Sequence, residues 1–427
     1  MAVARTLKQQ ALEAGFDLVG IAPPTALEDL GFLPQWIKKG CGGEMHYLAD
    51  RRREDPRRVL PSVQSIICVG LIYNTPFPYS TDAARRSEGE RNSTHQDSPA
   101  HEAPSRAWVS RYAWGMDYHR VMREKLEKLR AAVAKLAPGV ETRVYVDTGP
   151  VVERAFARLS GIGWMGKNTC LINEHKGSWF FLGVILTNLG LEPELPAPDR
   201  CGSCTRCLEA CPTGALVEPY VMDASRCISY FNIELKGTIP ELFREAIGTN
   251  VFGCDICQDV CPWNHRPSSA VSGPLDQIDA REERPETGLQ QRGAATTDPA
   301  AFQPMQIAVH PRQRPSHGAS NEDPASRVPP PEPFSLFNPS LRDLAVLTEE
   351  DFCRLFARSP IKRVKYRGWL RNLCVAIGNS RDCRFLPWLE SAAEHPDPIV
   401  KEHAAWALRQ LQSAVKGQES KVKGLCL

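Results

Sequence analysis

The segment Cys201–Gly214 reads CGSCTRCLEACPTG, and its cysteines decide how the middle of the chain folds. Two residues separate Cys201 from Cys204 and Cys204 from Cys207, and Cys211 follows after three residues with a proline behind it. This is the bacterial ferredoxin spacing, in which three cysteines hold one [4Fe–4S] cluster and the fourth ligates another. The segment therefore predicts a ferredoxin-like iron–sulfur cluster, and it requires further ligands elsewhere.

The remaining ligands follow in two short motifs. CDICQDVCP supplies Cys254, Cys257 and Cys261, and SRCISY supplies Cys227. Because the fourth cysteine of such a run serves the other cluster, we assign the ligands crosswise. One cluster takes Cys201, Cys204, Cys207 and Cys261, and the other takes Cys211, Cys227, Cys254 and Cys257. Paired CxxC motifs also suit tetrahedral zinc, but two runs ending in Cys-Pro favour iron–sulfur clusters.

The composition is that of a globular chain large enough for two or three domains, with 427 residues, 42% hydrophobic and 24% charged. The net charge of +2 does not exclude nucleic acid, since a basic face can lie within a balanced total. The start MAVARTLKQQALEAGFDLVGIAPP lacks a secretory pattern and no apolar run could span a membrane, so we expect a cytoplasmic protein. Fifteen cysteines then indicate metal, because the cytosol keeps thiols reduced.

Periodicity and turn residues divide the chain into three predicted domains. Residues 1–190 combine helical periodicity, as in ARTLKQQALEAG, with buried strands such as SVQSIICVGLIY, which predicts an α/β domain. Residues 191–265 form the cluster domain, and residues 333–427 have the short amphipathic helices of HEAT-like repeats. Stretches poor in large apolar residues predict a flexible insertion at 80–106 and a disordered one at 266–332.

Three motifs before the cysteines contain candidate polar residues: RYAWGMDYH, VDTGPVVER and GIGWMGKNT. Asp147 follows a predicted strand, where an aspartate more often caps a turn than performs chemistry. Asp117 and His119 also suit a capping aspartate and a core histidine. The GxGxxG match at 161–166 follows a predicted helix, so we expect its glycines to let the backbone approach a large cofactor and not a dinucleotide.

The order of these motifs and the cysteine runs, followed by RNLCVAIGN and HAAWAL, resembles the bacterial epoxyqueuosine reductase family over most of the chain. The resemblance implies an oxidoreductase that reduces epoxyqueuosine to queuosine at the wobble position of tRNA. It implies a nitroreductase-like α/β domain that binds cobalamin, a ferredoxin-like domain with two [4Fe–4S] clusters, and a C-terminal all-α HEAT-like domain. Electrons from an unidentified donor would pass through the clusters to cobalamin.

The resemblance also implies roles for particular residues. Asp147 matches the proton donor, which would need a raised pKa to donate at neutral pH. The eight cysteines match the cluster ligands in the same crossed pairing, and Lys236 matches a tRNA contact. Cobalamin contacts are implied at Arg53, Ser110, Asp147, Leu171, Ser229, Cys254 and Asp255.

The basic stretch RSPIKRVKYRGWLR, residues 358–371, predicts a further tRNA contact, because its cations alternate with aromatic residues. We expect Lys362, Arg363, Lys365 and Arg367 to neutralise phosphates, with a solvated helix face as the alternative. For the whole chain, the alternatives are a reductive dehalogenase-like corrinoid enzyme and a non-catalytic iron–sulfur electron carrier. The missing twin-arginine signal and the HEAT-like tail argue against the dehalogenase, and we expect a monomer.

Overall fold

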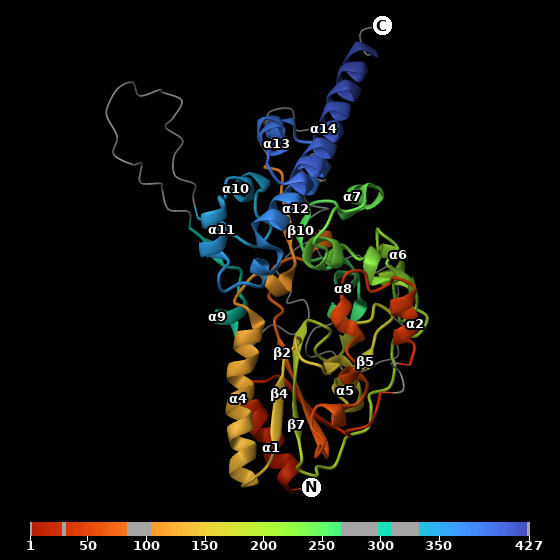
Figure 1. The fold of residues 1–427 in the computed structure, drawn as a ribbon, viewed down its shortest axis with the longest axis vertical. Helices are drawn as coiled ribbons and strands as arrows, with labels where there is room; N and C mark the ends of the chain where they lie inside the picture. The colour runs from red at the N-terminus through yellow and green to blue at the C-terminus, as the bar shows by residue number, and fades with distance from the viewer. Residues whose placement is uncertain (1, 28–30, 83–103, 266–297, 309–332, 425–427) are drawn as a thin grey trace, which may run out of the picture.

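The computed structural model describes residues 2–27, 31–82, 104–265, 298–308 and 333–424. The N-terminal part is built on a four-stranded sheet in the order β1-β2-β7-β4, with strands Leu18–Ala22, Ser65–Ile72, Phe180–Thr187 and Thr142–Tyr145 (Figure 1). All neighbouring strands in this sheet are antiparallel. Helices and a sheet thus share this part of the chain, as predicted, but in an antiparallel arrangement.

Helices cover both faces of the sheet. α1 (Ala2–Glu13) and α4 (Tyr118–Leu136) pack on one face, and α5 (Glu153–Leu159) packs on the other (Figure 1). The central strand β2 is buried throughout, with Ile67, Val69 and Leu71 facing α4 while Ile66, Cys68 and Ile72 face α5. A strand that is apolar on both faces requires such covering layers.

Short elements precede and follow the sheet strands. They are α2 (Leu33–Lys38), η2 (His46–Ala49), η3 (Arg51–Glu54), η4 (Pro56–Arg58), η5 (Arg111–Ala113), β5 (Trp164–Met165) and β6 (Leu171–Ile172). In the cluster region they are α6 (Arg206–Ala210), β8 (Leu216–Glu218), β9 (Val221–Met222), η6 (Ala224–Arg226), α7 (Glu241–Ile247), β10 (Asn250–Phe252), α8 (Ile256–Asp259) and η8 (Pro262–Asn264). The segment η7 (Tyr230–Glu234) is a π-helix, a rare form that often marks functional sites.

The C-terminal part is almost entirely helical. Its elements are α10 (Leu341–Ala345), α11 (Glu349–Leu355), η11 (Pro360–Val364), α12 (Lys365–Ser380), η12 (Cys383–Phe385), α13 (Leu386–Ala393) and α14 (Pro398–Gly424). α12 packs against α14 on one side and β10 on the other. Phe231, Phe252 and Trp369 lie in one continuous core, so the parts predicted as separate domains at 191–265 and 333–427 are packed together.

A strand pair also joins the cluster region to the N-terminal part. β10 pairs in parallel with β3 (Trp108–Val109), which immediately precedes the predicted cobalamin contact Ser110. Two loops that are far apart in the sequence are thereby fixed side by side. Within the described parts of the chain, no helix is both long and apolar enough to cross a membrane.

The two predicted insertions are only partly described. The prediction of disorder for 266–332 is wrong for residues 298–308, which form α9 (Pro299–Phe302) and β11 (Gln306–Ile307). β11 pairs with β12 (Phe334–Ser335), and the buried Phe302 ring packs against Phe181, so apolar side chains order this segment. The insertion predicted at 80–106 is described only at 80–82 and 104–106, and the remainder of both stretches lies outside the described residues.

Candidate functional site

Asp147 lies just beyond the end of β4, the edge strand of the sheet. Its φ of 55° is in the left-handed region, which aspartate tolerates better than most residues. Its side chain is 48% exposed, so it is accessible to a ligand. A non-glycine residue held in this conformation is a candidate for function.

Residues from two distant segments surround the Asp147 carboxylate. The hydroxyl of Tyr118, at the start of α4, donates a hydrogen bond to Asp147 Oδ2 at 2.8 Å. His119 Nε2 lies 3.3 Å from the same oxygen, and Arg363 Nη1 from η11 lies 3.8 Å from it. Tyr118 and His119 were not predicted as site residues, although their motif precedes VDTG in the sequence.

The ionisation state of Asp147 differs from the prediction. Burial raises its pKa, but the contacts with His119 and Tyr118 and the charge of Arg363 outweigh this effect and lower the pKa to about 2. The prediction of a raised pKa is therefore wrong for the protein without substrate. At neutral pH Asp147 is a carboxylate here, and a proton must reach it before it can act as an acid.

His119 is the more acidic of the two proton-bearing side chains of α4 that contact Asp147. Burial lowers its pKa, but contacts of its two ring nitrogens with Asp117 and Asp147 raise the pKa to about 9. Asp117 Oδ1 lies 2.8 Å from His119 Nδ1, and Asp117 Oδ2 lies 2.9 Å from Lys362 Nζ. Asp117 does cap α4, as its position suggested, and it also orients the imidazolium.

Three buried side-chain atoms near Asp147 make no hydrogen bond among the described residues. One is His119 Nε2, which contacts Asp147 as an ion pair, and the other two are Nε of Arg53 and Oε1 of Glu153. Burial and the charge of Asp147 raise the pKa of Glu153 to about 7, while Arg53 acts against this rise. A buried donor and acceptor without partners are costly, and a polar cofactor with amide groups would satisfy both. This part of the site therefore fits the implied cobalamin.

The other predicted cobalamin contacts occupy different environments. Asp255 is 1% exposed and accepts hydrogen bonds from Trp108 Nε1 at 3.0 Å, Ser110 Oγ at 2.5 Å and the Arg111 backbone N–H at 2.8 Å. The side chains of Ser110 and Asp255 are thus engaged with each other, across the β3–β10 pair.

Three further residues of this set lie elsewhere along the chain. Leu171 is buried in the core between the sheet and α5. Ser229 is partly buried at the start of η7, and Cys254 is adjacent to Asp255.

Cysteines of the first predicted group lie near one another, and their ligation of a cluster stays a prediction. Cys201 and Cys261 lie in one small buried cluster with Trp164 and Trp263. Burial and the neighbouring thiols of Cys201 and Cys204 raise the pKa of Cys207 to about 11. Burial, Cys201 and Cys207 contribute to raising the pKa of Cys261 to about 12.

The second group is also contiguous. Burial and the Cys211 thiol contribute to raising the pKa of Cys227, and burial and Cys227 contribute to raising that of Cys254. The pKa of Cys257 is raised by a hydrogen bond with Cys170, by burial and by Cys254.

The described cysteines are all free, and no three ligand-type side chains within the described ranges converge on a single metal ion. In a [4Fe–4S] cluster each thiolate binds a different iron, and buried thiols need such cations to ionise.

The GxGxxG match has a different role from the predicted one. A Cβ on Gly163 would lie 2.2 Å from the Ile172 backbone oxygen, so that glycine permits approach of the protein's own backbone. Lys167 Nζ donates to the carbonyls of Gly202 at 2.6 Å and Cys204 at 3.0 Å, and Asn168 Nδ2 donates to that of Cys257 at 3.1 Å. The motif thus holds the loops of both cysteine groups.

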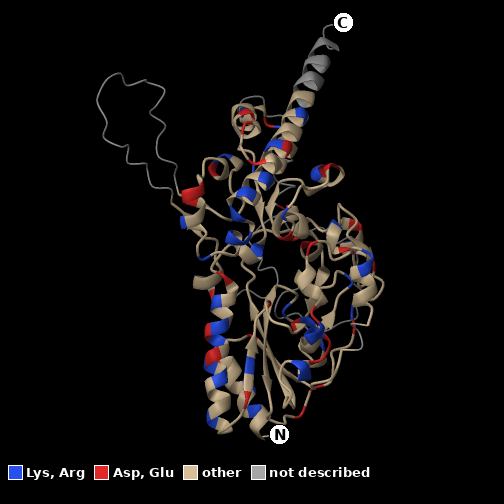
Figure 2. Ribbon diagram, in the orientation of Figure 1, with Lys and Arg blue, Asp and Glu red and all other residues tan. Residues whose placement is uncertain are grey.

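The predicted tRNA contacts gather around the start of α12, where Figure 2 shows several Lys and Arg positions. Lys362 and Lys365 are exposed, and Arg363 is partly exposed. Arg367 Nη2 donates to the Lys236 backbone oxygen at 2.9 Å, which brings together the two segments that the sequence assigned to tRNA.

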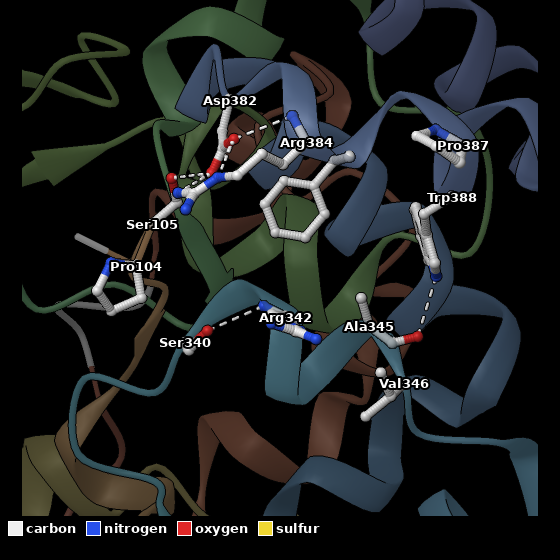
Figure 3. Close-up of a pocket in the computed structure, with 11 residues that line it drawn as sticks. Pro104, Ser105, Ser340, Arg342, Ala345, Val346, Asp382, Arg384, Pro387 and Trp388 are labelled. Atoms are coloured by element: carbon white, nitrogen blue, oxygen red, sulfur yellow. Dashed lines mark hydrogen bonds and ion pairs between the residues drawn. The ribbon is translucent and has the colours of Figure 1, made fainter. Parts of the chain in front are cut away.

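A separate cavity of about 430 Å³ lies among the C-terminal helices (Figure 3). It is lined by Arg342, Phe385 and Trp388, together with Asp382, which accepts hydrogen bonds from Ser105 and Arg384. None of the predicted site residues lines this cavity, so it is distinct from the Asp147 network.

Comparison with known proteins gives consistent matches. The family model described as "Epoxyqueuosine reductase QueG, DUF1730" matches residues 53–148, and that described as "4Fe-4S double cluster binding domain" matches residues 200–264. The epoxyqueuosine reductase of Xanthomonas campestris pv. campestris is 35% identical over 410 residues, covering 95% of this chain and 96% of the relative. That of Escherichia coli is 34% identical over 412 residues, covering 96% and 89%.

A solved structure of epoxyqueuosine reductase with an epoxyqueuosine-modified tRNA-Tyr stem loop is 28% identical, covers 96% of this chain and 90% of that chain, and has a TM-score of 0.69. The fold, the 4Fe–4S-binding domain and these similarities define an iron–sulfur oxidoreductase. Within that class, the chain belongs to the epoxyqueuosine reductase family.

Proposed function

We propose that this protein reduces epoxyqueuosine in tRNA to queuosine, with Asp147 delivering a proton to the epoxide oxygen. The reaction takes up two electrons and two protons, opens the epoxide and releases water. The observation that carries the proposal is the Asp147 network, in which an accessible carboxylate contacts the His119 imidazole and a tyrosine hydroxyl. Protonation of the leaving oxygen needs such a positioned acid.

We propose two [4Fe–4S] clusters with the crossed ligand sets and a cobalamin that Arg53 and Glu153 help to hold. Cobalamin, when bound, would supply low-potential electrons to the epoxide carbon. The protein's own part is to hold the reacting groups and to move a proton from His119 to Asp147 Oδ2, across the 3.3 Å that separates them. We further propose a cytoplasmic location, an as yet unidentified electron donor and a monomer.

The test is incubation of the cofactor-loaded protein with epoxyqueuosine-containing tRNA and a reductant, followed by mass analysis of the nucleosides. We expect queuosine from the wild type and none from Asp147→Asn, because asparagine tolerates the left-handed backbone but carries no acidic proton. Asp382→Asn is the matched control, since that carboxylate is also hydrogen-bonded but lies in the separate cavity. Queuosine formation by Asp147→Asn at near wild-type rates would exclude the proposed acid.

A further inference from the structure

Asp147 needs a proton to act as an acid, yet the protein without substrate holds it as a carboxylate. Burial alone would favour the protonated form, and three neighbours reverse this preference. Two of them, Tyr118 and His119, belong to α4, and the third, Arg363, comes from the C-terminal helices. A change in any of these contacts on substrate binding would change the proton affinity of Asp147.

The two contacts from α4 are fixed within the protein. The Tyr118 ring stacks on Phe181 at 4.3 Å with an angle of 5° between the planes. His119 is held by Asp117 through a 2.8 Å contact to Nδ1. Neither residue can leave Asp147 without disturbing the packing of α4 on the sheet.

The contact from Arg363 is of a different kind. Its guanidinium spans two carboxylates loosely, with Nη1 at 3.8 Å from Asp147 Oδ2 and Nη2 at 3.4 Å from Glu234 Oε1. Its side chain is 34% exposed, and its neighbours in the sequence, Lys362 and Lys365, are exposed too. A partly exposed guanidinium at these distances is available to a stronger ligand from outside.

The backbone around Arg363 keeps it beside the acid. The Asp117 backbone N–H donates to the Arg358 carbonyl at 2.7 Å, which ties the loop before η11 to the start of α4. Lys362 Nζ binds Asp117 Oδ2 at 2.9 Å, so two successive cations of η11 contact two acids of the same network. A phosphate that approaches η11 from solvent would therefore contact Lys362 and Arg363, which are already paired with Asp117 and Asp147.

We propose that Arg363 is a positioning residue, which pairs with Asp147 in the tRNA-free protein and is transferred to a backbone phosphate of the tRNA when the substrate binds. The inference rests on the proposed function in one respect, namely that the ligand is tRNA. A bidentate guanidinium–phosphate pair is stronger than the present loose contacts. The proton affinity of Asp147 would then be higher when an RNA backbone occupies the site than in the tRNA-free protein.

The charges around Asp147 determine the direction of the effect. The titratable groups that face it are Tyr47, Tyr112, Tyr118, His119, Glu153, Glu234 and Arg363. Departure of Arg363 removes a positive charge from Asp147 and leaves the Glu234 carboxylate without this partner. Both changes raise the pKa of Asp147, and His119 keeps a proton ready for transfer. An opposite charge at such a distance lowers a carboxyl pKa by about one unit when partly solvated.

The test is an infrared titration of protein labelled with ¹³C-aspartate and loaded with its cofactors, in the absence of tRNA. The Asp147 band is identified by its loss in Asp147→Asn. We expect Arg363→Met to raise the pKa of Asp147 by about one unit, and Arg363→Lys, which retains the charge, to restore most of the wild-type value. Lys365→Met, the matched control from the same basic stretch, should leave this titration unchanged.

Addition of an unmodified anticodon stem-loop RNA extends the test to the transfer step. In the wild type the RNA should raise the pKa of Asp147 by a similar amount, and in Arg363→Met it should add little. The proposal is overturned if Arg363→Met leaves the titration unchanged, if Lys365→Met shifts it equally, or if the RNA shifts both proteins alike. The titration does not depend on turnover, so it tests the role of Arg363 even in a protein that forms no queuosine. Failure to form queuosine would contradict the proposed function and leave the titration result unaffected.

Discussion

Arg371 in α12 is expected to stabilise the segment that follows Cys227, which is a proposed cluster ligand. Its guanidinium is almost fully buried and donates to three backbone carbonyls, those of Phe231 at 2.6 Å, Leu235 at 2.7 Å and Gly237 at 2.8 Å. Burial lowers its pKa to about 10, but it remains charged at neutral pH. Although the basic stretch suggested a phosphate ligand here, Arg371 is a structural residue that holds η7.

Arg371→Met keeps the aliphatic packing but leaves three carbonyls without their donor. Each buried acceptor left unsatisfied costs about 1 kcal/mol or more, so we expect a loss of about 3 kcal/mol, partly offset by removal of a buried charge. Local opening of η7 should then expose Cys227 and accelerate release of iron to a chelator by up to about 100-fold.

The assay is the rate of iron release from the cofactor-loaded protein under anaerobic conditions, with urea unfolding as a second measurement. Arg381→Met is the matched control, because Arg381 lies at the C-terminal end of the same helix, α12, and its side chain is 63% exposed. Its Nη2 lies 3.5 Å from the carboxylate of Glu245 in α7. The control should change the unfolding free energy by less than about 0.5 kcal/mol. The reasoning is refuted if iron release from Arg371→Met is within about threefold of the control.

Three further predictions follow from the ligand sets, the histidine and the glycines. In the crossed assignment Cys211 and Cys227 hold the same cluster, so Cys211→Ser, Cys227→Ser and the double variant should each retain about four of eight irons. A double variant that retains no iron would show that the two cysteines serve different clusters. Because the pKa of His119 in the folded protein is raised to about 9, the stability that its protonated form contributes is complete below about pH 6.5 and is lost as pH rises through about 9. In urea unfolding, the wild type should therefore lose about 2 kcal/mol more stability than His119→Gln between pH 7 and pH 10. Equal losses in the two proteins would contradict this prediction. Gly163→Ala should lower the melting temperature, because its Cβ would lie 2.2 Å from the Ile172 carbonyl oxygen. The control Gly368→Ala, in α12, should leave the melting temperature unchanged or raise it. Equal melting temperatures of the two variants would argue against the clash.

Features that depend on local spacing were predictable from the sequence. The cysteine runs predict their ligand sets because short gaps constrain one loop around one cluster, and these sets stay a prediction. The apolar patterns predicted the strand within residues 62–73, the strand before Asp147 and the first helix, but they did not predict β1 or β7. The antiparallel order β1-β2-β7-β4 was not predicted, because pairing between distant strands leaves little local signal.

Features that depend on distant contacts could not be predicted in this way. Ser110 and Asp255 were predicted from the family resemblance to contact the cofactor. In the structure the Ser110 hydroxyl donates a buried hydrogen bond to the Asp255 carboxylate. The low pKa of Asp147 arises from residues 118, 119 and 363, of which the last is remote in sequence. The ordered segment 298–308 was missed because its few apolar residues are surrounded by a polar stretch, and only the shape of the core shows that they fit.

The position of Asp147 explains why three parts of the chain are packed into one unit. α4 supplies its tyrosine and histidine, and η11 supplies Arg363. The segment η7, which follows the proposed ligand Cys227, supplies the Glu234 that shares this arginine. Arg371 and Asn372 of α12 in turn fix η7 through its backbone carbonyls. The proton affinity of the proposed acid therefore depends on the sheet, the cluster region and the C-terminal helices together.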